Sequence, residues 1–68
     1  MKMSDWKIFY RDHLDQDRTS HSIPSEEAAL MLASNLYRWQ RAELYSIEGP
    51  NGSALHKDEI MRWMSVNK

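Results

Sequence analysis

Apolar and polar residues alternate along residues 6–11, the first predicted element of the chain. Trp6, Ile8 and Tyr10 fall on one face of an extended segment, whereas the opposite face carries Phe9 between two cations. Aromatic and β-branched residues favour strands. The pattern therefore predicts a strand with one fully apolar face and one wetter face.

Residues 12–22 are polar, and only Leu14 interrupts them. Such a composition is typical of an exposed loop. The alternative is a hairpin that includes a short second strand around Ser20 to Ile23.

A long helix is predicted after this polar segment. Ser25 can cap the free amides of its first turn, and two acids follow at the end that the helix dipole makes positive. Ser22 is the alternative cap, with Pro24 then in the first turn. Residues 28–39 contain no helix breaker, so the helix should run to about Gln40.

This helix carries more apolar residues than one sheet face can cover. Helical spacing predicts a stripe that packs on the sheet, with Trp39 at its edge. The members of the stripe are Ala29, Leu32, Ala33 and Leu36. Leu30, Met31 and Tyr37 lie off it, so these three large side chains are predicted to point outward.

Residues 43–48 predict a further strand. Strict alternation places Tyr45 and Ile47 on one face and Leu44 and Ser46 on the other.

The strongest turn signal of the chain follows at residues 49–52, Gly-Pro-Asn-Gly. Gly52 can supply the positive φ that a tight return requires, and residues 53–55 form a short return strand. A second helix begins near residues 56–59. Its inner face is predicted to hold Ile60, Trp63 and Met64, with Met61 pointing elsewhere.

These elements predict one α+β domain over residues 1–68. A small antiparallel sheet of two to four strands packs against one main helix, and a short C-terminal helix closes an end or carries a partner surface. The expected order is β-(β)-α-β-β-α.

Composition narrows the classes of function. The chain has 68 residues, no cysteine and a formal net charge of −1 at pH 7. It therefore contains no disulfide. Small domains without such cross-links often gain stability by self-association, so a homodimer is one expectation. No apolar run is long enough for a transmembrane helix. No apolar signal core follows Met1 to Asp5, which favours a cytoplasmic protein.

The polar loop carries residues that could bind a metal. Three histidines and three nearby acids are available, namely His13, His21, His56, Asp12, Asp15 and Asp17. Their spacing matches no helical zinc pair, and Asp15 to Asp17 lacks the glycine and closing glutamate of a calcium loop. We interpret the segment as a solvated loop, with no metal and no cofactor.

Catalytic motifs are also missing from the sequence. It has no Gly-x-Ser-x-Gly turn, and its acids cluster at helix starts and in the polar loop, where a structural role explains them. A chain of this length rarely encloses a ligand-sized pocket. We therefore expect a protein that is not an enzyme and acts on no small-molecule substrate.

Nucleic-acid binding is a second hypothesis. Arg38, Trp39 and Arg41 interleave cations with an aromatic ring, and Arg62 beside Trp63 repeats the combination. The competing interpretation places both tryptophans in the core. Contacts between basic side chains and phosphates supply most of the affinity for nucleic acids. Because the chain has no excess of basic residues, this contribution is weak.

The order of motifs resembles small bacterial and phage domains with a βαββ core. Glu26-Glu27-Ala28 opens an alanine-rich helix, and an Ile-x-Gly-x-x-Gly hairpin follows at residues 47–52. Those domains have largely no assigned activity, so the resemblance implies a fold and no site. The extended loop at residues 12–22 departs from their pattern.

The leading hypothesis is a small non-enzymatic protein–protein interaction module, an adaptor or an inhibitor, and a phage or mobile-element origin fits its composition. Its predicted surface is Leu30, Met31, Tyr37 and Met61, because interfaces are enriched in such side chains. The alternatives are a nucleic-acid-binding accessory protein using Arg38, Trp39, Arg41 and Arg62, and a domain of purely structural role.

Overall fold

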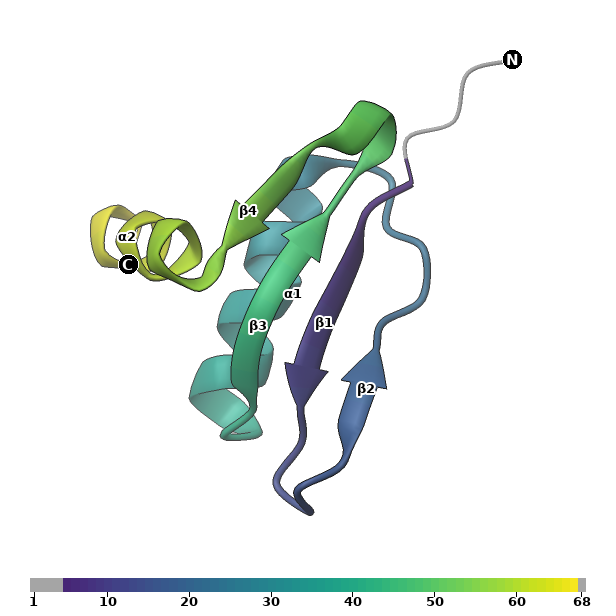
Figure 1. Cartoon of the computed structure of the whole chain (residues 1–68). Coiled ribbons are helices and arrows are strands. Elements are labelled where there is room, and N and C mark those ends of the chain that lie inside the picture. The colour runs from purple at the N-terminus through teal and green to yellow at the C-terminus, as the bar shows by residue number, and fades with distance from the viewer. Residues whose placement is uncertain (1–4, 68) are drawn as a thin grey trace.

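The computed structural model describes residues 5–67, apart from the side chain of Asn51. The expectation about the first residues of the chain lies outside this range. The elements are β1 (Lys7–Arg11), β2 (Asp17–Thr19), α1 (Glu26–Trp39), β3 (Glu43–Glu48), a 3-10 turn (Pro50–Gly52), β4 (Ala54–His56) and α2 (Lys57–Val66) (Figure 1). This order confirms the predicted α+β fold, with the optional second strand present.

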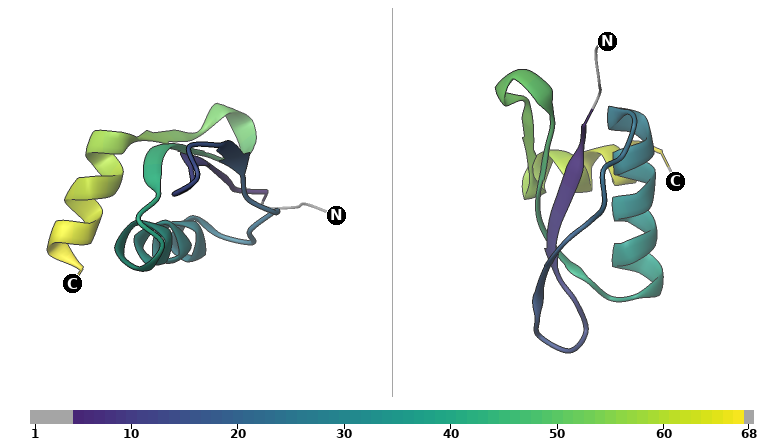
Figure 2. Two further views of the ribbon diagram at one scale, coloured as in Figure 1. Left: turned by 90° about the horizontal axis from the view of Figure 1, so that it is seen from below. Right: turned by 90° about the vertical axis from the view of Figure 1, so that its right-hand side faces the viewer.

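The four strands form one antiparallel sheet in the order β2-β1-β3-β4. α1 covers one face of this sheet, and α2 lies at the β4 edge, where it contacts α1 and is oriented crosswise to it (Figure 2). Within residues 5–67, no helix covers the opposite face of the sheet. Antiparallel sheets commonly have one packed and one solvated face.

The second strand begins earlier than the sequence pattern indicates. The Asp12 carboxylate accepts hydrogen bonds from the backbone N–H of Leu14, at 2.9 Å, and of Gln16, at 3.0 Å. These bonds turn the chain early, so β2 already pairs with β1 at Asp17. The placement of this strand at residues 20–23 is therefore wrong, although Ile23 forms an isolated bridge with Trp6.

A β-bulge in β3 changes which residues face the core. The ladder pairs Phe9 with Ser46 and Tyr10 with Leu44, which leaves Tyr45 as an extra residue on β3. The bulge shifts the alternation by one position. Leu44 and Ile47 are consequently both buried, so the prediction that Tyr45 shares a face with Ile47 is wrong.

Ser25 caps α1 as predicted, because its Oγ accepts a hydrogen bond from the Ala28 N–H at 3.1 Å. The apolar stripe of α1 packs on the sheet, with Leu32 only half-buried. The core consists of Ile8, Ile23, Ala29, Leu30, Ala33, Leu36, Ala42, Leu44, Ile47, Ile60 and Met64. It extends beyond the sheet face of α1, since it includes Leu30 and two residues of α2.

Leu30 is buried, with 6% of its surface exposed, so the prediction that it points outward is wrong. Leu30, Ser34 and Arg38 form one i, i+4, i+8 row on α1. An Arg38 guanidinium N–H donates to the Met64 carbonyl of α2 at 3.4 Å. This row therefore faces α2, which covers a second side of the helix.

The turn and the second helix follow the sequence pattern. Gly52 has φ of 77°, as expected for the return. Ile60 and Met64 are buried and Trp63 is half-buried. The Glu59 carboxylate accepts a hydrogen bond from the His56 backbone N–H at 2.9 Å, which caps the start of α2.

Candidate functional site

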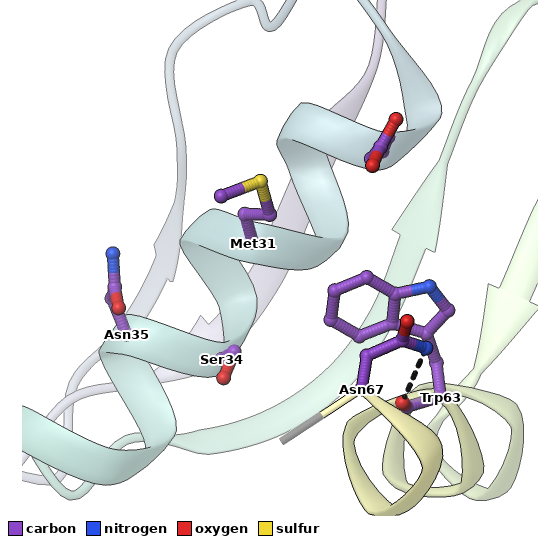
Figure 3. A pocket seen from close by; sticks show the side chains of 6 residues that line it. Met31, Ser34, Asn35, Trp63 and Asn67 are labelled. Atoms are coloured by element: carbon purple, nitrogen blue, oxygen red, sulfur yellow. Dashed lines mark hydrogen bonds between the residues drawn. The ribbon is translucent and has the colours of Figure 1, made fainter.

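A cleft of about 240 Å³ lies between α1 and α2 (Figure 3). α1 contributes a row one turn apart, Glu27, Met31 and Asn35, together with Ser34. α2 contributes Trp63 and Asn67, which are also one turn apart. Both helices thus present a regular face to the same cleft.

The apolar part of the cleft consists of Met31 and Trp63. Met31 is 56% exposed even though it lies in the middle of α1. The indole of Trp63 extends from α2 toward α1 (Figure 3) and also packs against the core. An exposed apolar side chain that lines the same cleft as an aromatic ring is a common feature of contact surfaces.

The polar part of the cleft is formed by hydroxyl and amide groups and one carboxylate. Asn67 donates a hydrogen bond through Nδ2 to the Trp63 carbonyl at 2.9 Å, which fixes the orientation of its amide (Figure 3). Asn35 is exposed. Glu27 is the only charged residue in the lining, and among residues 5–67 it forms no ion pair.

The structure brings together only part of the predicted interaction surface. Met31 lines the cleft, and Tyr37 is 42% exposed outside it. Met61 of α2 is half-buried against the core, and Leu30 of α1 lies within the core.

The residues that α2 adds to the cleft were not predicted from the sequence. Trp63 was predicted as core, and Asn67 had no predicted role. Their spacing of four residues, matching that of Met31 and Asn35 on α1, was the available signal. The spacing shows that each pair shares a helix face, but not that the two faces meet.

The predicted nucleic-acid residues do not form one surface. Trp39 is 80% exposed, so the interpretation of this residue as core is wrong. Arg38 instead turns toward α2, where it binds the Met64 carbonyl. Arg62 lies about half a helical turn from both Ile60 and Met64, so it points away from the core and from α1.

A second cleft, of about 300 Å³, lies between the β1–β2 hairpin and the end of α1. Its lining includes Tyr10, Asp12, His13, Leu14, Arg18 and Gln40. Asp12 and Arg18 form an ion pair there, and Arg18 also donates to Gln16. The polar groups of this cleft are thus largely occupied by one another.

The loop acids and histidines do not converge. Asp12 pairs with Arg18, and Asp17 pairs with Arg11 and accepts a hydrogen bond from the Tyr45 hydroxyl at 3.0 Å. Among the described residues, no three His, Cys, Asp or Glu side chains are placed to hold a metal ion.

Two pKa shifts have clear structural causes. The Arg18 guanidinium, with the N–H of Gln16, lowers the pKa of Asp12 below its ordinary value. Partial burial and the hydrogen bond to Asp17 raise the pKa of Tyr45. Both groups belong to the hairpin and the sheet, where the ion pair, the hydrogen bonds and, for Tyr45, partial burial account for the shifts.

None of the helices between residues 5 and 67 has both the length and the apolar character needed to cross a membrane. Comparisons with protein-family models, with curated proteins and with solved structures find no match for this chain. The functional assignment therefore depends on the geometry of the α1–α2 cleft.

Proposed function

We propose that this chain is a small non-enzymatic protein-interaction module of the cytoplasm, and that the α1–α2 cleft is its docking surface. The observation that carries the proposal is the exposure of Met31 beside Trp63 in a cleft built by two helices. Methionine adapts to partners of varied shape, and tryptophan is a frequent anchor of binding energy.

The polarity of the cleft supports the same proposal. An interface typically has an apolar centre with a polar rim. Here Met31 and Trp63 supply the apolar contact, whereas Ser34, Asn35 and Asn67 supply hydrogen-bonding groups beside it. The cleft is smaller than the roughly 300–1,000 Å³ sites that enclose drug-sized ligands, which favours a protruding side chain of a partner.

Affinity capture from cells that express the protein tests this proposal. The bait proteins are the wild type, Met31→Glu and the control Val66→Glu. Both variants add one negative charge with a good helix former, and Val66 is 77% exposed outside the cleft. Circular dichroism first establishes that both variants fold.

We expect a partner protein that the wild type and Val66→Glu capture and that Met31→Glu does not capture. Equal capture by all three baits, or capture of no protein above background, contradicts the proposal. Light scattering on the purified chain shows whether the partner is a second copy. A dimer that Met31→Glu dissociates and Val66→Glu does not would identify self-association through the cleft.

A second candidate function rests on Trp39. Its 80% exposed indole, with Arg38 and Arg41 nearby in the sequence, can stack on an unpaired base. Fluorescence anisotropy with a single-stranded oligonucleotide at low salt tests it. Binding that weakens with salt and is lost in Trp39→Ala supports this candidate, whereas no binding at low salt removes it.

A further inference from the structure

The lining of the α1–α2 cleft has a definite chemical character. Along the α1 row, the acidic Glu27 comes first, the apolar Met31 lies in the middle and the amide-bearing Asn35 comes last, and the indole of Trp63 lines the same cleft from α2. Asn67 adds a second amide from α2. Each group suits a different part of a basic peptide.

We infer that the cleft binds an extended peptide segment of a partner protein that carries a lysine or arginine side chain. This inference rests on the proposed function and specifies the chemistry of the partner. The aliphatic stem of the side chain packs on Met31 and on the indole of Trp63. Its cationic group meets the Glu27 carboxylate and the negative face of the indole.

The amides match the main chain of such a peptide. An asparagine side chain offers one acceptor and two N–H donors, and so pairs with a peptide N–H and C=O together. Nδ2 of Asn67 already donates one hydrogen bond to the Trp63 carbonyl. Its oxygen and its second N–H, with the exposed amide of Asn35, can bind a backbone that is extended along α1.

The dimensions of α1 set the length of the peptide. Glu27 and Asn35 are eight residues apart, which corresponds to about 12 Å along an α-helix. An extended chain spans that distance with about four residues, at roughly 3.3 Å each. The cleft therefore holds a short segment with one long side chain.

Charge also sets the direction. Arg38, eleven residues after Glu27, lies about 16 Å further along the helix axis, where its guanidinium donates to the Met64 carbonyl. The cation of the ligand is therefore expected at the Glu27 end and not at the Arg38 end. Among residues 5–67, no ion pair competes for Glu27.

A titration followed by ¹H–¹⁵N NMR tests this inference with three synthetic peptides. The probes are acetyl-Ala-Ala-Lys-Ala-Ala-amide, the same peptide with norleucine in place of lysine, and the same peptide with glutamate. The resonances of interest are the Trp63 indole N–H and the side-chain amides of Asn35 and Asn67. The lysine peptide is expected to shift all three resonances along a saturating binding curve. The norleucine peptide is expected to bind with several-fold lower affinity, and the glutamate peptide is expected to cause no shift.

Glu27→Lys and the control Glu26→Lys separate a specific contact from overall charge. Both variants change the net charge equally and lie in the first turn of α1, but only Glu27 lines the cleft. Glu27→Lys is expected to lower the affinity for the lysine peptide about tenfold, whereas Glu26→Lys is expected to lower it less than about twofold.

The inference is overturned if the lysine peptide shifts none of these resonances at about 10 mM, a concentration well above the dissociation constant of about 1 mM that a weak complex has. It is also overturned if norleucine binds as well as lysine, or if the two glutamate variants behave alike. Each of these results leaves the proposed function standing when Met31→Glu still loses a captured protein. If Met31→Glu and Val66→Glu instead capture the same proteins, the proposed function itself is contradicted.

Discussion

Gly49 follows β3 directly, and its contact with Trp6 gives a sharp test of how the sheet packs. A Cβ atom at Gly49 would lie 2.5 Å from two carbons of the Trp6 ring and 2.7 Å from a third, whereas ordinary contacts begin at 3.4 Å. The ring would have to move by about 1 Å, and overpacking of this kind costs about 1–3 kcal/mol. The φ of Gly49 is −127°, which any residue adopts, so the cost is steric.

Gly49→Ala also lowers the conformational entropy of the unfolded chain, and this effect offsets about 0.4–1 kcal/mol of the steric cost. The expected net loss is about 1–2 kcal/mol in the free energy of unfolding. For a domain of this size, that loss lowers the Tm by roughly 4–16 °C. Thermal and urea unfolding followed by circular dichroism measure it.

The same substitution in a Trp6→Leu background provides the control. A smaller side chain removes the clash, so Gly49→Ala should there be neutral or stabilising by up to about 1 kcal/mol. If Gly49→Ala lowers stability equally in both backgrounds, or in neither, the packing of Trp6 on Gly49 is not the cause and the reasoning fails.

Three further predictions concern the ends of α1 and the β1–β2 hairpin. Arg41 has φ of 56°, a left-handed conformation that glycine adopts without strain and β-branched residues resist. Arg41→Gly should therefore stabilise the domain by about 1 kcal/mol, and Arg41→Val should destabilise it. Urea midpoints that rank the other way contradict this prediction. Ser25→Ala removes the cap of α1 and should cost about 1 kcal/mol in the same assay, with Ser25→Asp close to the wild type. Because Arg18 lowers the pKa of Asp12 in the folded state, this pair contributes stability above the unfolded pKa of about 3.9, and the contribution is lost as the pH falls through the lowered folded pKa. The stability gap between the wild type and Asp12→Asn should therefore close as the pH falls below about 5 and through the lowered folded pKa, and a gap that is independent of pH would refute the assignment.

The parts of the fold that local chemistry determines are those that the sequence predicts well. The cap at Ser25, the strand at residues 43–48 and the positive φ at Gly52 all agree with the structure. Each depends on residues within one turn or one strand, so a pattern of neighbouring residues is sufficient.

The features that the sequence pattern misses depend on contacts between distant elements. The extra residue at Tyr45 arises from the pairing of β3 with β1, and it brings Leu44 to the same buried side of β3 as Ile47. Leu30 is buried because α2 lies beside α1, and no periodicity within α1 can show this. The candidate cleft depends on the same packing, so only Met31 of its lining was identified from the sequence.

The most direct test of the central claim is the affinity of the captured protein for the purified chain, measured by isothermal titration calorimetry. The docking of a partner in the α1–α2 cleft predicts that Met31→Glu weakens binding at least about tenfold, which corresponds to about 1.4 kcal/mol. Val66→Glu should remain within about twofold of the wild type. Equal affinity of Met31→Glu and the wild type would contradict the assignment of the cleft as the docking surface.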